Sequence, residues 1–395
     1  MSYLLLPVLL AGCSATFIDN TVPRLDNTGA IMDSHDFSLH KYPNEKGYFM
    51  TSIAYGECKE PAARGCDQTA DKCGFQANHT INVWHSTDLS SGSWEFITTA
   101  VSLDNRPAGT IYRPDAIFNP HTNEVVLWYN WLNAAGVYEG YAAYTAPSIR
   151  GPFTRMREAV NVSMQNSTEE CGDFHLFIDP ADLTPYVIAG CGFHMWIERL
   201  LPSMLDSAGD TSPTGRHLFS EYFIEAPALF MRGGTYYAFF DSCCCYCYQG
   251  SGAVVHTAPH PLGPWTTQGD VACVPTAALP LPLSSPPAAA TRMAAFLSAI
   301  GAPEKEGLSA QPTPGQGCQY VNPKTTSSLR SQQSDIFEVD LADGSTAWVW
   351  AGDRWQQSWD GTKAHDPQLW VPIAFSDTGV VAPLRWLDNF TLPIV

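Results

Sequence analysis

Carboxylic acids stand at the beginning of several short apolar segments, where they could carry acid and base chemistry. Asp36, Asp173 and Glu225 each precede a run rich in β-branched and aromatic residues, and Glu225 also has apolar neighbours on both sides. A carboxyl group in such a setting loses hydration, so its pKa rises toward the value that a general acid needs. Glu225 is therefore a candidate general acid. The alternative is a buried carboxylate paired with Arg113 or Arg354.

The composition limits the ligands that such acids could act on. The 395 residues include 21 basic and 39 acidic residues, for a net charge of −18, and 12% of the residues are aromatic. A nucleic-acid ligand needs a positive surface, and any polyanion would be repelled. A neutral sugar suits a chain that is both acidic and rich in aromatic residues. No apolar stretch reaches the roughly 20 residues of a transmembrane helix, so none is expected.

The elements that must position these residues are predicted to be β-strands. Apolar runs such as 47–55, 124–131, 234–240 and 347–350 are rich in β-branched and aromatic residues and are bounded by turn signals. Glycine and proline number 30 each, which argues against long helices. The sequence therefore predicts an all-β protein with frequent turns.

An internal repeat indicates how the strands are grouped. Residues 114–118 resemble 226–230, and 144–153 resemble 256–265, with a common offset of 112 residues that aligns Glu225 with Arg113. Half of 112 is 56 residues, which suits a four-stranded propeller blade. The units fall near 34–96, 112–155, 171–217, 223–267 and 329–375, which predicts a five-bladed β-propeller. Its innermost strands would bring acids from different blades to one axis.

The remaining segments lie at the ends and in one insertion. Residues 1–25 are predicted to be a signal-like or disordered N-terminus, and 26–395 the propeller. The segment 384–395 could pair with the N-terminus and close the ring. Residues 274–328 contain a stretch rich in proline and alanine and are predicted to be a flexible insertion between blades four and five. Leu10–Cys13 is similar to a bacterial lipoprotein cleavage box, so a lipid anchor at Cys13 is an alternative to a cleaved signal.

Cysteines and glycosylation sequons indicate an oxidising compartment. The 12 cysteines do not form two CxxC pairs at zinc-finger spacing, so disulfides are favoured over a metal site. Sequons at Asn78, Asn161, Asn166 and Asn389 agree with a secreted glycoprotein.

Several motifs together resemble glycoside hydrolase family 43, and in particular its galactan 1,3-β-galactosidase branch. The motifs occur in the same order and at similar spacing, and they cover roughly 26–395 apart from the insertion. They are Ser34–Asp36, Arg113–Asn119 followed by Val126–Trp128, Gly172–Asp179, Glu225–Phe230, Ser331–Gln333, Gly352–Trp355 and Leu369–Pro372.

The resemblance implies a five-bladed propeller with an inverting mechanism. Glu225 would protonate the glycosidic oxygen, Asp36 would activate water on the opposite face, and Asp173 would tune the acid. Inversion requires the acid and the base to stand roughly 6.5–9.5 Å apart. The resemblance is also compatible with a calcium ion on the axis, although no run of ligands identifies one, and no other cofactor or metal is expected.

The sequence departs from the galactosidase branch at two places. That branch has a glycine at the position of Asp36 and a glutamine in the role of base, which matches Gln332, whereas this chain carries both residues. A neutral amide is a poor base unless it tautomerises, so Asp36 is the preferred candidate. The branch also has a glutamate before the Arg-Pro of blade two, where this chain has Tyr112, so strict β-1,3-galactan specificity does not follow.

Other polar and aromatic residues are candidates for substrate binding. His35, Arg113 and Gln332 could bind sugar hydroxyls, and Trp355 could stack on a sugar ring; packing in the core is the alternative for each. We expect a secreted monomeric glycoside hydrolase that acts on an oligo- or polysaccharide, cleaving β-linked galactan or related plant or algal polysaccharide side chains. The alternatives are an inactive carbohydrate-binding propeller and a sister activity such as an arabinofuranosidase or xylosidase.

Overall fold

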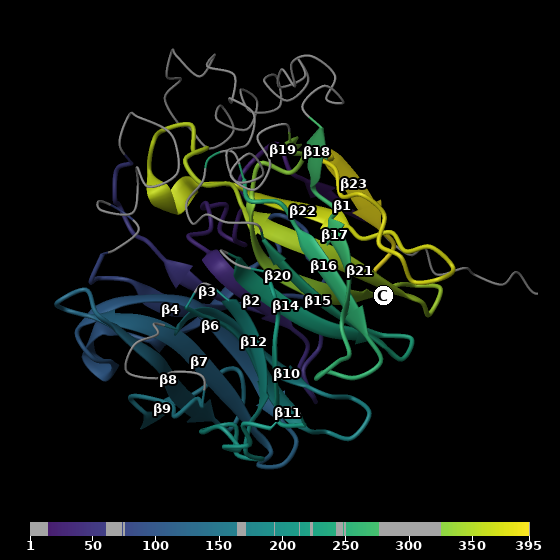
Figure 1. Ribbon diagram of the computed structural model, residues 1–395. Helices are drawn as coiled ribbons and strands as arrows, with labels where there is room; N and C mark the ends of the chain where they lie inside the picture. The colour runs from purple at the N-terminus through teal and green to yellow at the C-terminus, as the bar shows by residue number, and fades with distance from the viewer. Residues whose placement is uncertain are drawn as a thin grey trace, which may run out of the picture.

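Five antiparallel sheets are arranged around one axis, each with its first strand innermost (Figure 1). The computed structural model describes residues 15–60, 73, 76–163, 171–192, 194–212, 214–221, 224–241, 248, 250–275 and 325–394. This confirms the predicted five-bladed propeller. None of the helices in these described ranges is long and apolar enough to cross a membrane.

The observed blades follow the predicted units closely. Blade one is β2 (His35–His40), β3 (Tyr48–Ala54), β4 (Thr80–Ser86) and β5 (Glu95–Val101). Blade two is β6 (Gly109–Asn119), β7 (Glu124–Asn133), β8 (Tyr138–Ala146) and β9 (Thr154–Arg157). Blade three is β10 (Cys171–Ile178), β11 (Pro185–Cys191), β12 (His194–Arg199) and β13 (Arg216–Leu218). Blade four is β14 (Glu225–Arg232), β15 (Thr235–Asp241), β16 (Val254–Ala258) and β17 (Thr266–Asp270). Blade five has three strands: β20 (Gln332–Asp340), β21 (Thr346–Asp353) and β22 (Gln368–Pro372).

The hydrophobic core is divided among the seams between blades. One cluster of buried side chains lies between each pair of neighbouring blades, including blades five and one, so the ring is closed by packing. Strand β7 shows why its sequence is apolar throughout. Trp128 packs toward blade three, whereas its neighbour Tyr129 packs toward blade one. Successive side chains of a strand point to opposite faces, so a strand covered on both faces needs no polar alternation.

The innermost strand of every blade begins with an irregularity in its pairing. The register shifts lie between His35 and Ser38, Tyr112 and Asp115, Cys171 and Phe174, Glu225 and Ala228, and Gln333 and Asp335. Bulges of this kind bend a strand and turn a side chain away from its regular direction. Here they lie at the starts of the strands that carry the predicted site residues.

The bulges correct the alignment of the repeat by one residue. The residues with a left-handed backbone are Arg113 (φ 49°) in blade two and Ala226 (φ 53°) in blade four. The same bulge in both strands therefore matches Arg113 with Ala226, and Glu225 with Tyr112. The register after the bulge agrees, because it resumes at Asp115 in blade two and at Ala228 in blade four. The offset of 112 residues, which fits residues 144–153 and 256–265, is therefore one residue too short for the innermost strands.

The two ends of the chain pair with each other. Strand β1 (Thr16–Asp19) is antiparallel to β23 (Asn389–Leu392). The side chain of Asn20 binds both the amide nitrogen and the carbonyl oxygen of Trp370 in β22, which attaches this pair to blade five. Strand β1 thus lies before residue 26, the predicted start of the propeller. The predicted closure forms as a separate two-stranded sheet.

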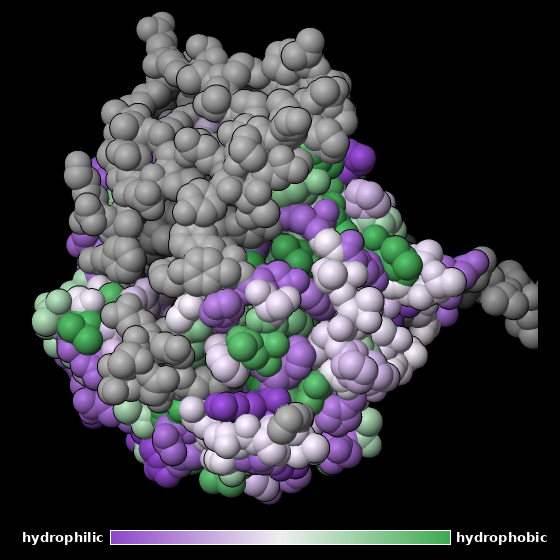
Figure 2. Space-filling model, viewed as in Figure 1, coloured by the Kyte–Doolittle hydropathy of each residue, from purple (hydrophilic) through white to green (hydrophobic). Residues whose placement is uncertain are grey.

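Two further observations concern the insertion and the surface. The ends of the predicted insertion form the short pair β18 (Cys273–Pro275) and β19 (Thr325–Ser327), and residues 276–324 lie outside the described residues. Disulfides join Cys58 to Cys73 and Cys171 to Cys191, which confirms the disulfide prediction. Among the sequons, Asn78 and Asn161 are exposed, Asn389 is half-buried and Asn166 lies outside the described residues. On the face in Figure 2, hydrophobic residues of the described surface lie in small groups among polar ones.

Candidate active site

Three carboxyl groups from different blades surround one buried arginine at the start of the innermost strands. The guanidinium of Arg113 in β6 lies 3.4 Å from the carboxylate of Asp173 in β10 and donates to the carbonyl oxygens of Gln333 and Ser334 in β20. Its positive charge lowers the pKa values of both Asp36 and Glu225, opposing larger effects that raise them. Asp173 accepts a hydrogen bond of 3.0 Å from the backbone of Ala226, the neighbour of Glu225. The structure thus brings together all three predicted catalytic residues.

Asp36 lies on the bulge of β2 and is partly exposed. Its backbone has a φ of 46°, and its amide donates a 2.7 Å hydrogen bond to the carboxylate of Asp353 at the end of β21. The hydroxyl of Tyr55 donates to the Asp36 carboxylate at 2.8 Å. Burial, followed by the nearby Asp353, raises the pKa of Asp36 to about 6. Asp36 can therefore accept a proton near neutral pH.

Glu225 is also half-buried, and its surroundings favour the protonated form more strongly. Burial raises the pKa of Glu225 well above its ordinary value, and the carboxylates of Asp241 and Asp173 add to the effect. Asp241 is fixed because one of its oxygens accepts a hydrogen bond from the Glu225 backbone amide. Gln332 donates to Oε2 of Glu225 at 3.3 Å. The two candidate catalytic acids thus have different proton affinities, as an acid and base pair requires.

The four residues predicted to bind substrate are more deeply buried than the carboxyl groups of Asp36 and Glu225. His35, Arg113, Gln332 and Trp355 are 0%, 3%, 4% and 1% exposed. His35 contacts Asp353 through Nδ1 at 3.1 Å, and Trp355 donates from Nε1 to Oε1 of Gln332 at 2.7 Å. Direct contact of these four side chains with a sugar stays a prediction, and the contacts observed here are with other side chains of the site. His35 contacts Asp353, Arg113 contacts Asp173, and Gln332 contacts Glu225. Trp355 contacts Gln332.

Three residues that contact the site were not among the predicted site residues. Asp353 accepts hydrogen bonds from the Asp36 amide and the Ser334 hydroxyl and contacts His35; Tyr55 binds Asp36, and Asp241 binds the backbone of Glu225. A signal for the two aspartates was present. Each ends the second strand of its blade, directly opposite Gln332 or Glu225 in the pairing register.

A second polar cluster lies further along the axis. His40 contacts Asp115 at 2.8 Å, and His175 lies 3.5 Å from Asp335. One atom each from His40, Asp115 and His175 lies within 4.8 Å of the other two, so the three groups could hold a metal ion. Two of these donors are imidazole nitrogens, whereas calcium takes oxygen ligands. The donor set does not fit the calcium ion that the resemblance suggested.

The charges within this cluster and its hydrogen bonds to the backbone account for its burial near the axis. Although burial opposes the effect, the imidazoles of His175 and His40 lower the pKa of Asp115 to about 2. The other oxygen of Asp115 accepts from the backbone of Leu176, and Asp335 accepts from Leu39. These bonds join blade two to blade three and blade five to blade one near the axis.

This architecture defines the chain as a five-bladed propeller of the kind found in glycoside hydrolase family 43. The chain is similar to the crystal structure of an exo-β-1,3-galactanase from Clostridium thermocellum, with a TM-score of 0.63 and 18% identity over 94% of this chain. It is also similar to an exo-β-1,3-galactanase from Phanerochaete chrysosporium solved with β-1,3-galactotriose, with a TM-score of 0.62 and 15% identity over 95% of this chain.

The extent of these matches differs. The chain spans 66% of the Clostridium structure and 68% of the Phanerochaete structure. It spans 99% of a family 43 β-1,3-galactosidase solved with galactodeoxynojirimycin, with a TM-score of 0.61 and 17% identity over 94% of this chain. No family model matches the sequence, and the search of curated proteins finds no match. At these identities the likeness establishes the fold.

Proposed function

We propose that the chain is a glycoside hydrolase that cleaves β-linked galactan or related polysaccharide side chains with inversion at the anomeric carbon. The observation that carries the proposal is the axial group of Asp36, Asp173 and Glu225 around Arg113, with two carboxyl pKa values raised to different extents. The likeness to family 43 galactanases and galactosidases supports the same activity.

In the proposed reaction, Glu225 gives its proton to the glycosidic oxygen while the bond from that oxygen to the anomeric carbon breaks. The leaving oxygen keeps the electron pair of the bond. A water molecule forms the new bond from the opposite face, and its proton passes to Asp36. Burial, together with the carboxylates of Asp241 and Asp173, keeps Glu225 protonated, and Arg113 limits the repulsion among the carboxylates.

The contacts of Gln332 support Asp36 as the base. An amide becomes basic only after tautomerisation, which moves a proton onto its oxygen. Oε1 of Gln332 accepts a 2.7 Å hydrogen bond from the indole of Trp355, and this bond stabilises the carbonyl form. Asp36 is an anion above about pH 6 and needs no such step.

The sugar is assigned by chemistry and likeness together. The net charge of −18 favours a neutral substrate, and the similar structures are those of an exo-β-1,3-galactanase and a β-1,3-galactosidase. Tyr112, which occupies the position in blade two that Glu225 occupies in blade four, donates its hydroxyl proton to Tyr138 at 2.7 Å. This neutral pair stands where the galactosidase branch has a glutamate, so a related β-linked sugar remains within the proposal.

The proposal includes a secreted monomer. The disulfides Cys58–Cys73 and Cys171–Cys191 and the exposed sequons at Asn78 and Asn161 support an oxidising compartment and access to glycosylation. Treatment of protein from a eukaryotic host with a deglycosylating enzyme, followed by mass measurement, tests whether Asn78 and Asn161 carry glycans.

The decisive experiment is hydrolysis followed by proton NMR. The full chain is incubated with β-1,3-galactobiose, longer β-galactans, and aryl galactosides, arabinofuranosides and xylosides. The proposal expects release of a sugar whose first-formed anomer is α, because inversion converts a β-linkage to an α-product. A β-product would refute inversion. Binding of a sugar with no turnover on any substrate would favour the inactive carbohydrate-binding propeller.

A further inference from the structure

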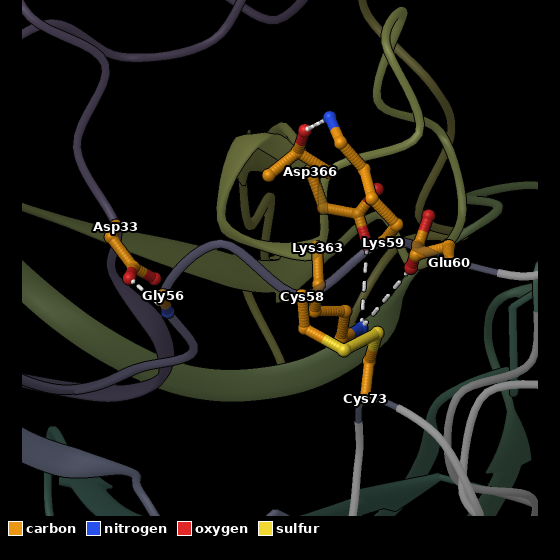
Figure 3. The surroundings of a disulfide bond; sticks show 9 residues. Asp33, Gly56, Cys58, Lys59, Glu60, Cys73, Lys363 and Asp366 are labelled. Atoms are coloured by element: carbon orange, nitrogen blue, oxygen red, sulfur yellow. Dashed lines mark hydrogen bonds and ion pairs between the residues drawn. A yellow bond between two sulfur atoms is a disulfide. The ribbon is translucent and has the colours of Figure 1, made fainter.

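A buried cation lies against the aromatic ring that contacts Gln332. The side chain of Lys363 is 0% exposed, and its Nζ stands 3.4 Å from the centroid of the Trp355 ring. The same Nζ lies 3.3 Å from Asp366 and 3.8 Å from Glu60 (Figure 3). An ammonium group over an indole withdraws electron density from the ring, which makes the indole N–H a stronger donor.

The indole connects this cation to the candidate acid. An indole nitrogen can only donate, so the atom 2.7 Å from Nε1 of Trp355 must be the carbonyl oxygen of Gln332. The amide nitrogen of Gln332 must then face Glu225, to whose Oε2 it donates at 3.3 Å. The carbonyl oxygen of a carboxylic acid accepts better than its hydroxyl oxygen, so this bond to Oε2 favours the form of Glu225 with its proton on Oε1.

We propose that Lys363 is a positioning residue for the general acid, acting through Trp355 and Gln332 to fix which oxygen of Glu225 carries the proton. The inference rests on the proposed hydrolase function. It assigns Trp355 and Gln332 to the orientation of the acid. Lys363 does not touch the substrate in this scheme.

A local framework keeps Lys363 in place. Asp366, its ion-pair partner, accepts hydrogen bonds from the backbone amides of residues 356, 357 and 358, which follow Trp355 directly. The backbone of Lys363 donates to the carbonyl oxygen of Cys58 at 2.9 Å, and Cys58 is joined to Cys73 by a disulfide (Figure 3). Lys363 thus connects the loop that carries Trp355 to a cross-linked segment of blade one.

The dependence of the rate on the leaving group distinguishes this role from a structural one. A dinitrophenyl β-galactoside loses a stable phenolate and needs little protonation, whereas β-1,3-galactobiose needs the acid. Replacing Lys363 by Met should lower kcat on galactobiose by about 10–100-fold, part of the ~10²–10⁴-fold that general acid catalysis contributes. The loss on the dinitrophenyl substrate should be at least tenfold smaller. Lys363→Arg should recover most of the galactobiose activity.

Two further variants complete the design. Trp355→Phe keeps a ring under the cation but removes the N–H donor, so it should reproduce the selective loss on galactobiose. Lys59→Met is the matched control. Lys59 is an exposed lysine next to Cys58 and Glu60, which Lys363 contacts, and its own Nζ lies 3.7 Å from Asp360. If Lys363→Met is unstable because it leaves Asp366 and Glu60 uncompensated, the double variant Lys363→Met/Glu60→Gln removes one of these carboxylates.

The outcomes separate this inference from the proposed function. Equal losses on both substrates, or no loss, would overturn the role of Lys363. If the wild type hydrolyses neither substrate, the proposed function fails, and the connection is still tested by NMR of protein labelled with ¹⁵N-tryptophan. The indole proton of Trp355, assigned with Trp355→Phe, should shift upfield in Lys363→Met. An unchanged resonance would refute the connection.

Discussion

At the scale of single residues, the candidate site consists of similar groups given different properties by their neighbours. Both side chains are half-buried, but Asp36 receives a hydroxyl hydrogen bond from Tyr55, whereas Glu225 lies near Asp241 and Asp173 and receives an amide hydrogen bond from Gln332. The neighbouring charges therefore differ between the two carboxyl groups, and this difference is the basis for proposing Asp36 as the base and Glu225 as the acid.

Glu225→Gln should remove nearly all turnover of galactobiose but leave sugar binding intact. The amide keeps the shape of the side chain and cannot give up the catalytic proton, so a loss of about 10²–10⁴-fold in kcat is expected. Steady-state kinetics and calorimetric titration with galactose measure the two properties. A variant within a few-fold of wild type would show that Glu225 is structural.

Asp36→Asn should abolish net hydrolysis, and azide should restore part of the activity as a small replacement nucleophile. Gln332→Ala is the matched variant, expected to slow the reaction without abolishing it, because Gln332 orients the acid. An active Asp36→Asn together with an inactive Gln332→Ala would make Gln332 the base.

The pH dependence of kcat/KM should be bell-shaped. The base must be deprotonated, so the rate should rise with pH through about 6, the raised pKa of Asp36. The acid must be protonated, so the rate should fall at higher pH as Glu225 loses its proton. Stopped assays with galactobiose across a series of buffers test this profile. A rising limb at the ordinary carboxyl pKa would exclude Asp36 as the base.

At the scale of elements, the bulges at the starts of the innermost strands determine where these side chains lie. In blades one and four, a backbone amide at the bulge donates a hydrogen bond to an aspartate of a neighbouring blade. The amide of Asp36 donates to Asp353, and the amide of Ala226 donates to Asp173. The same hydrogen bonds that hold neighbouring blades together therefore also position the carboxyl groups.

Asp353→Asn should move the rising limb of the pH profile to lower pH. Asp353 is the main charge that raises the pKa of Asp36, so its neutralisation should lower that pKa. Asp340→Asn, an exposed aspartate paired with Lys41 at the far end of β20, is the control and should leave the limb unchanged. The same limb in both variants would show that Asp353 does not tune Asp36.

At the scale of the whole molecule, the ring is closed by packing between blades and by the pairing of the two chain ends. Asn20 is fully buried, and its amide binds Trp370 and Leu387. Its neighbours Ile18 and Leu392 belong to the core cluster between blades five and one. The closure thus depends on residues that are far apart in the sequence.

Asn20→Ala should destabilise the protein without changing the site. Removal of the amide leaves buried backbone groups of Trp370 unsatisfied, which costs about 1–3 kcal/mol. Thermal unfolding should show a lower Tm, while kcat at low temperature stays at the wild-type value. Asn133→Ala, in a half-buried turn of blade two, is a control away from the closure. An unchanged Tm for Asn20→Ala would show that the pair β1–β23 does not hold the ring.

The sequence by itself determined the blades, because strand periodicity, turn signals and an internal repeat are local properties. It also placed Asp36, Asp173 and Glu225 at the starts of innermost strands, where the structure has them, while their catalytic roles stay a prediction. Only the tertiary structure decided what surrounds them. The one-residue shift at the bulges, the partners of Asp353 and the contact of Lys363 with Trp355 depend on which blades meet at the axis, and burial there fixes both the pKa values and the accessibility of each side chain.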